Sequence, residues 1–142
     1  MSAAPSQVDA FHASLARASS DPRFLDVFYA RFIESSRDVA VVFAGKDMEQ
    51  LKRKLRSSLH VMTLAVDGAP GADMYLDYLG KVHTRLDIAP RMYDTWLDAL
   101  VATAAECDPQ FTRDLDAVWR AVVGAGVQMI KDAATEAPAS PA

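Results

Sequence analysis

Residues 78–100 read YLGKVHTRLDIAPRMYDTWLDAL, and this stretch decides the fold. Leucines lie four residues before and three residues after His83, a spacing that places them with the histidine on one face of a helix. Pro90 suits the first turn of a helix, because its missing N–H has no helical partner there. Tyr93, Leu97 and Leu100 follow at helical spacing. The stretch therefore predicts a short helix ending near residue 84, a break, and a long helix from residue 90.

The rest of the chain also contains residues that mark the starts and ends of helices. It shows no strand-like alternation of apolar and polar residues. Helical spacing of apolar residues predicts further helices over about 6–17, 21–33, 37–43, 47–66 and 108–133. Asp47 suits a helix cap, with Gln50 as its capping-box partner. Asp21-Pro22 and Asp108-Pro109 each suit a helix start, with the aspartate as cap and the proline in the first turn.

These elements predict one all-α domain of six to eight helices over residues 1–133. Their unequal lengths argue against a regular four-helix bundle. Residues 134–142 read ATEAPASPA, which predicts a disordered tail.

Composition narrows the class of protein. The chain has 142 residues, of which 51% are hydrophobic, and a net charge of -4 without a basic block. Nucleic acids and acidic membrane surfaces are therefore poor partners. Cys107 is the one cysteine, which excludes an internal disulfide and zinc sites built on several cysteines. The sequence shows no secretory signal and no apolar run long enough to cross a bilayer, so we expect a cytoplasmic protein.

Two polar side chains lie where an apolar face is expected. His83 is either a core histidine with satisfied nitrogens or an axial ligand of haem iron. Tyr29, in the most apolar helix, is either a core tyrosine bonded to a backbone carbonyl or a donor to a gas on that iron. Phe43 and the stripe of Leu51, Leu55 and Leu59 read in isolation as core. The sequence contains no glycine-rich phosphate loop and no recognisable nucleophile motif.

Taken together, these stretches resemble a globin, and more narrowly the bacterial single-domain globins and the globin domain of flavohaemoglobins. FYARFIESSRDVAVVF (28–43) resembles the segment with the family's distal tyrosine and corner phenylalanine, here Tyr29 and Phe43. LKRKLRSSL (51–59) resembles the distal helix, and 78–100 resembles the proximal histidine segment. LDAVWRAVVGAGVQMI (115–130) is similar to the family's last helix.

The resemblance implies a three-on-three helical sandwich around haem b. His83 would be the metal ligand. Tyr29, Phe43, Leu51, Leu55, His83, Tyr93 and Leu97 would together bind the cofactor. Leu51 and Leu55 would lie over the distal face, one turn apart, and Tyr93 would lie near the proximal pocket.

Two positions depart from the flavohaemoglobin pattern. Leu51 stands where those proteins commonly have glutamine, and also resembles the globin-coupled sensors. Gln50 is adjacent, but one residue along a helix is a rotation of about 100°, so we expect its side chain to point away. The carboxylate that pairs with the proximal histidine has no match, because Ala134 aligns there. Without that carboxylate the proximal histidine would be less anionic and would push less electron density onto the iron. This weakens the case for oxygen-activating chemistry.

The resemblance implies reversible binding of a diatomic gas, O2, NO or CO, by five-coordinate iron. One alternative is an NO dioxygenase that draws electrons from a separate reductase, since this chain carries no flavin or nicotinamide domain. Others are a gas-sensing module and a globin that has lost haem, although His83 and Phe43 argue against the last. A second copy of the chain, in a homodimer, is a further expected partner. The helical phase of His60 places it away from iron.

Overall fold

The computed structural model describes residues 5–66, 68, 70–85 and 90–136, which form seven helices and no strand. The helices are α1 (Pro5–Ser19), α2 (Phe24–Glu34), α3 (Arg37–Phe43), α4 (Met48–Val66), α5 (Ala72–Arg85), α6 (Pro90–Cys107) and α7 (Arg113–Glu136). The predicted all-α class is therefore confirmed. None of these helices is long and apolar enough to cross a membrane.

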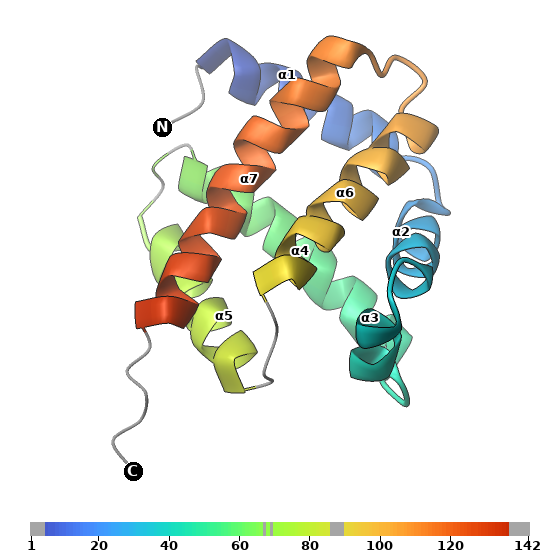
Figure 1. Ribbon diagram of the computed structural model, residues 1–142. Coiled ribbons are helices and arrows are strands. Elements are labelled where there is room, and N and C mark those ends of the chain that lie inside the picture. The colour runs from blue at the N-terminus through green and yellow to red at the C-terminus, as the bar shows by residue number, and fades with distance from the viewer. Residues whose placement is uncertain (1–4, 67, 69, 86–89, 137–142) are drawn as a thin grey trace.

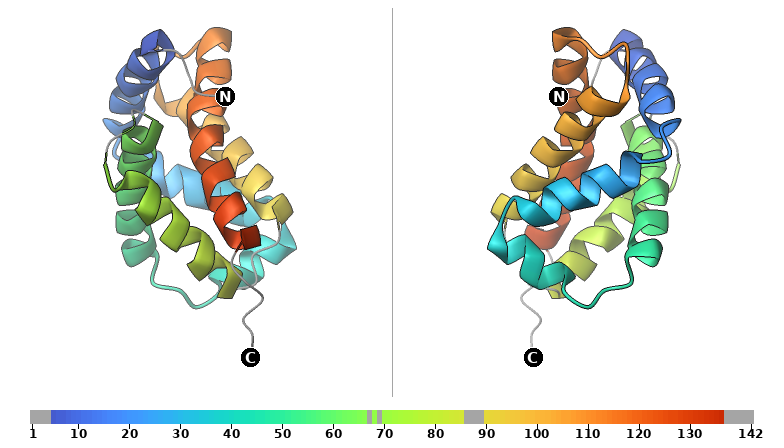
Figure 2. Two further views of the ribbon diagram at one scale, coloured as in Figure 1. Left: turned by 90° about the vertical axis from the view of Figure 1, so that its left-hand side faces the viewer. Right: turned by 90° about the vertical axis from the view of Figure 1, so that its right-hand side faces the viewer.

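The helices pack in two layers (Figures 1 and 2). One layer holds α1, α4 and α5, and the other holds α2, α6 and α7, with short α3 at one end. In the second layer α6 lies between α2 and α7, and α7 packs against all three helices of the first layer. This arrangement is the predicted three-on-three sandwich.

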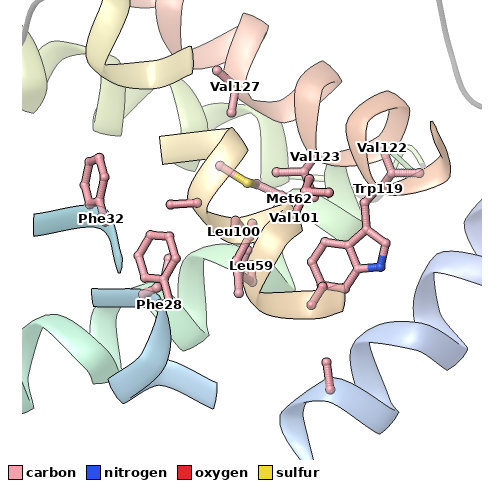
Figure 3. Close-up of a cluster of buried hydrophobic side chains, with 14 of the residues drawn as sticks. Phe28, Phe32, Leu59, Met62, Leu100, Val101, Trp119, Val122, Val123 and Val127 are labelled. Atoms are coloured by element: carbon pink, nitrogen blue, oxygen red, sulfur yellow. The ribbon is translucent and has the colours of Figure 1, made fainter. Parts of the chain in front are cut away.

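The core between the layers is apolar and aromatic (Figure 3). Trp119, Phe28 and Leu100 are fully buried, and the valines of α7 project toward the same region. Phe11 of α1 meets the Trp119 ring edge-on, with ring centroids 4.8 Å apart. Large aromatic side chains thus connect the first helix to the last, and their burial is a major source of stability.

Several helix starts agree with the sequence-based predictions. Asp47 caps α4, since its Oδ1 accepts hydrogen bonds from the N–H groups of Glu49 and Gln50 at 3.1 and 3.3 Å. α3 spans Arg37–Phe43 as predicted, and α6 begins at Pro90. Ser36 caps α3 by accepting a hydrogen bond from the Asp38 N–H.

The two Asp-Pro pairs do not start helices, and this prediction was wrong. Each instead forms a turn before the helix. Oδ1 of the aspartate accepts the N–H two residues on, from Arg23 or Gln110, at 2.9 Å in both turns. The aspartate carbonyl then accepts the N–H of the phenylalanine three residues on. α7 begins later, where the Thr112 hydroxyl accepts the N–H of Leu115. Local side-chain bonds of this kind compete with a helical start.

The end of α7 also differs from the prediction. The helix continues through Glu136, so it includes three residues that the sequence placed in the tail. Alanine and glutamate are good helix formers, which explains the extension. The rest of the predicted tail, 137–142, lies outside the described residues.

Gly126 allows α4 and α7 to approach closely. A Cβ atom on Gly126 would lie 2.9 Å from Cγ of Met62 and 3.2 Å from its Cβ. Those atoms lie near the α4 backbone and cannot move aside as a side-chain tip can. Gly124 lies in the same helix, and a Cβ there would meet only Leu97, at an ordinary 3.9 Å.

A buried polar cluster ties α1 to the turn before α7. The Asp108 carboxylate, with no exposed side-chain surface, accepts hydrogen bonds from Ser14 at 2.6 Å and from Nε of Arg17 at 2.7 Å. Trp119 donates its indole N–H to Ser14 at 2.8 Å. Burial alone would raise the pKa of Asp108, but the hydrogen bonds from Arg17, Ser14 and the Gln110 N–H outweigh it and lower the pKa.

Replacing Asp108 by Asn should lower the free energy of unfolding by about 1–3 kcal/mol at pH 7, because the buried hydroxyl of Ser14 and the half-buried Arg17 lose a charged acceptor. The folded-state pKa lies below the ordinary value near 3.8. The stabilisation is therefore present above that value and is lost as pH falls below it. Urea unfolding at pH 7 and pH 3 measures both effects. Asp9→Asn, at an exposed position of α1, is the control. An equal loss in both variants would contradict the role of the cluster.

A matched pair of glycine substitutions tests the α4–α7 contact. Gly126→Ala should destabilise the protein by about 1–3 kcal/mol through overpacking against Met62. Gly124→Ala should be neutral or stabilise by up to about 1 kcal/mol, because alanine is the better helix former. Denaturation midpoints of the two variants give the comparison. Two stabilised variants would show that the helices can separate at little cost.

Candidate functional site

Tyr29 is the polar centre of the candidate site. It lies in the middle of α2, is 7% exposed, and donates its hydroxyl to the carbonyl oxygen of Leu51 at 3.0 Å. Burial raises the pKa of this phenol to about 12. Tyr29 therefore stays neutral at physiological pH and keeps its proton available for a hydrogen bond.

Phe43 is the last residue of α3, and its side chain lies against Tyr29. Its ring meets the rings of Tyr29 and Phe32 edge-on, with centroids 5.8 and 5.6 Å apart. The corner that places Phe43 is sharp, because Gly45 has a φ of 72°, which side chains other than glycine rarely adopt. The short helix and its glycine therefore place a half-buried aromatic ring against Tyr29 and Phe32 of α2.

The first turns of α4 supply the other part of this surface. Leu51 is half-buried and Leu55, one turn later, is buried at 6% exposure. Both belong to the apolar cluster that includes Tyr29 and Phe43. Gln50 is exposed, as expected from its helical phase, and so offers no side chain to this surface.

The remaining predicted residues lie on α5 and α6. Tyr93 is buried and Leu97 half-buried in the same apolar cluster, and burial raises the pKa of Tyr93 to about 12. Leu97 faces Gly124 of α7. His83 lies near the end of α5, but its side chain is outside the described residues. The structure thus brings Tyr29, Phe43 and Leu51 into direct contact and leaves the ligand role of His83 a prediction.

Sequence reasoning missed the aromatic residues that hold the site in place. Phe28 lies edge-on to Tyr29 at 5.0 Å, stacks on Phe32 at 5.6 Å, and meets Trp96 of α6 at 6.0 Å. Phe28 and Phe32 lie four residues apart in the sequence of α2. That spacing indicated only that the helix is buried. The sequence allowed a backbone carbonyl as one acceptor for Tyr29, and the structure shows such a bond, but the sequence did not indicate that the carbonyl is that of Leu51.

Comparison with known proteins defines the class. The family model for globins matches residues 28–130, which include every element of the candidate site. This chain belongs to the globin family.

Among solved structures, the chain is similar to a protein of Pseudomonas aeruginosa PAO1 that is described as structurally highly homologous to a human hemoglobin. The two share 35% sequence identity and superpose with a TM-score of 0.85, covering 89% of this chain and 97% of the other. A search of curated protein sequences found no match.

Globin family membership implies a haem cofactor. The described residues fit such a group, because a flat apolar ring system needs apolar and aromatic neighbours, with a few polar groups that fix orientation. Phe43, Leu51, Leu55 and Leu97 supply the apolar neighbours, and Tyr29 supplies one neutral donor.

Proposed function

We propose that this globin holds haem b with His83 as the iron ligand and reversibly binds a diatomic gas, O2, NO or CO, beside Tyr29. The observation that carries the proposal is the buried, neutral hydroxyl of Tyr29 in apolar surroundings. Haem would supply an iron with one coordination position open to the gas.

The apolar residues would exclude water and hold the ring system. Phe43 would pack on one edge of the haem. Leu51 and Leu55 would cover its distal face. Tyr93 and Leu97 would contact it from α6. Tyr29 would donate its proton to the gas. A ligand that draws negative charge from iron, as O2 does, is the better acceptor, since hydrogen bonds to charged acceptors are the stronger ones.

The carbonyl of Leu51 competes for the same proton. It lies in the first turn of α4, where the helix also gives it the N–H of Leu55 as a partner. Tyr29 can therefore leave it without stranding a buried acceptor. The gain from binding O2 is then a difference between two hydrogen bonds. A neutral one contributes about 1 kcal/mol and one to a charged acceptor about 1.5–3 kcal/mol.

Removing the Tyr29 hydroxyl should speed O2 release by roughly five- to tenfold, because a difference of about 1 kcal/mol is a factor of about five. Stopped-flow dissociation rates of Tyr29→Phe measure the effect. CO release should change less, because CO draws less charge. Tyr78→Phe, an exposed tyrosine on α5, is the matched control. An unchanged O2 rate in Tyr29→Phe would exclude the role.

The iron ligand is tested by absorption spectra of the ferric, reduced and CO-bound protein. We expect a five-coordinate, histidine-type ferrous spectrum in the parent protein and its loss in His83→Gly. Added imidazole should restore it by filling the space that the side chain leaves. A parent-like spectrum in His83→Gly without imidazole would show that another group holds the iron. No Soret band after reconstitution of the parent with haem would exclude haem binding itself.

A further inference from the structure

A cavity that is open to solvent on one side lies apart from the residues of the candidate haem site. It has a volume of about 230 Å³ and is bounded by α1, the turn before α2, the start of α2 and the middle of α4. Of the residues assigned to the haem site, the six whose side chains the structure describes do not line it. Its ligand chemistry can therefore be argued independently of the proposed gas binding.

The floor of the cavity is its buried part and is mainly apolar, and its one polar member, Thr63, donates its hydroxyl to the Leu59 carbonyl. Phe24, Leu25 and Leu59 line it and are buried, with exposed fractions of 3%, 8% and 4%, and half-buried Leu15 completes this floor. Its volume exceeds that of the engineered 150 Å³ cavity known to bind benzene. A body of one aromatic ring, or of similar size, would fit on this floor.

The rim carries nitrogen donors. Arg56 and His60 lie one turn apart on α4, both exposed, and His12 of α1 lies opposite. Within the described part of the chain, Arg56 has no carboxylate in ion-pair distance. An arginine in this position can bind a carboxylate through two parallel hydrogen bonds.

The acidic residue of the lining does not cancel this preference. Asp21 is engaged by Arg23, which donates from its backbone N–H at 2.9 Å and from its guanidinium at 3.0 and 3.3 Å. These bonds hold the pKa of Asp21 below its ordinary value. α2 also begins at the cavity, and its N-cap residue Arg23 provides no side-chain acceptor. A helix N-terminus adds a partial positive charge.

We propose that this cavity binds a small amphiphilic carboxylate, with its carboxylate group on Arg56 and His60 and its apolar body against Leu25 and Leu59. The apolar floor sets the size of the ligand. The cationic rim selects an anion over a neutral molecule of the same shape.

Benzoate and benzamide separate these two contributions, because they have nearly the same shape and differ in charge. The protein is reduced and saturated with CO, so that any haem iron is diamagnetic, and methyl resonances are followed by NMR. We expect benzoate to give saturable shifts of the Leu25 and Leu59 methyl groups in the millimolar range. Benzamide should bind at least about fivefold more weakly, because it lacks the charge-assisted hydrogen bonds.

Arg56→Gln should weaken benzoate binding by about five- to tenfold. Arg53→Gln makes the same charge change at an exposed position of α4 outside the cavity, and should change the affinity less than twofold. Unshifted Leu55 methyl signals would show that both variants keep the fold.

Three results would overturn the proposal. Equal affinity for benzamide and benzoate would remove the anion preference. Equal losses in the two arginine variants would reduce the effect to overall charge. Benzoate shifts centred on Leu51 and Leu97 would place the ligand in the candidate haem site. The loss of iron binding in His83→Gly would leave all three tests unaffected.

Discussion

The close approach of α4 to α7 at Gly126 is the constraint on which the rest of the structure depends. α7 packs against all three helices of the opposite layer, and α4, one of those three, carries the candidate distal residues. Because this contact leaves no room for a Cβ atom on residue 126, the distance between the layers here is set by the Met62 side chain packed against the Gly126 backbone. The space available to a flat cofactor further along α4 follows from that distance.

A series of aromatic rings in contact with one another supports the candidate site. Trp96 of α6 meets Phe28 of α2, and Phe28 contacts both Tyr29 and Phe32. Phe32 in turn contacts Phe43. Edge-on and stacked rings of this kind restrict one another's rotamers. The Tyr29 hydroxyl is therefore positioned by the core, and its hydrogen bond to α4 adds the last restraint.

Much of the fold was predictable because its signals are local. Gly45 after an apolar heptapeptide bounded α3, and Asp47 and Pro90 marked the starts of α4 and α6. The prediction that the Asp-Pro pairs start helices was wrong because the same residues that cap a helix also form a turn. Which of the two structures forms depends on the next three residues. At the site, the family spacing selected Tyr29 and Phe43. The acceptor for Tyr29 and the cavity beside Arg56 arise from helix packing, which no spacing along the chain encodes.

The hydroxyl of Tyr29 donates to a main-chain oxygen, that of residue 51. The side chain at position 51 is therefore not needed to hold the tyrosine. Every amino acid has that carbonyl. The side chain at position 51 can therefore vary between leucine and a polar residue such as glutamine while the anchor of Tyr29 persists. The polarity of the candidate site can thus be changed at one position without altering the contact between the two helices.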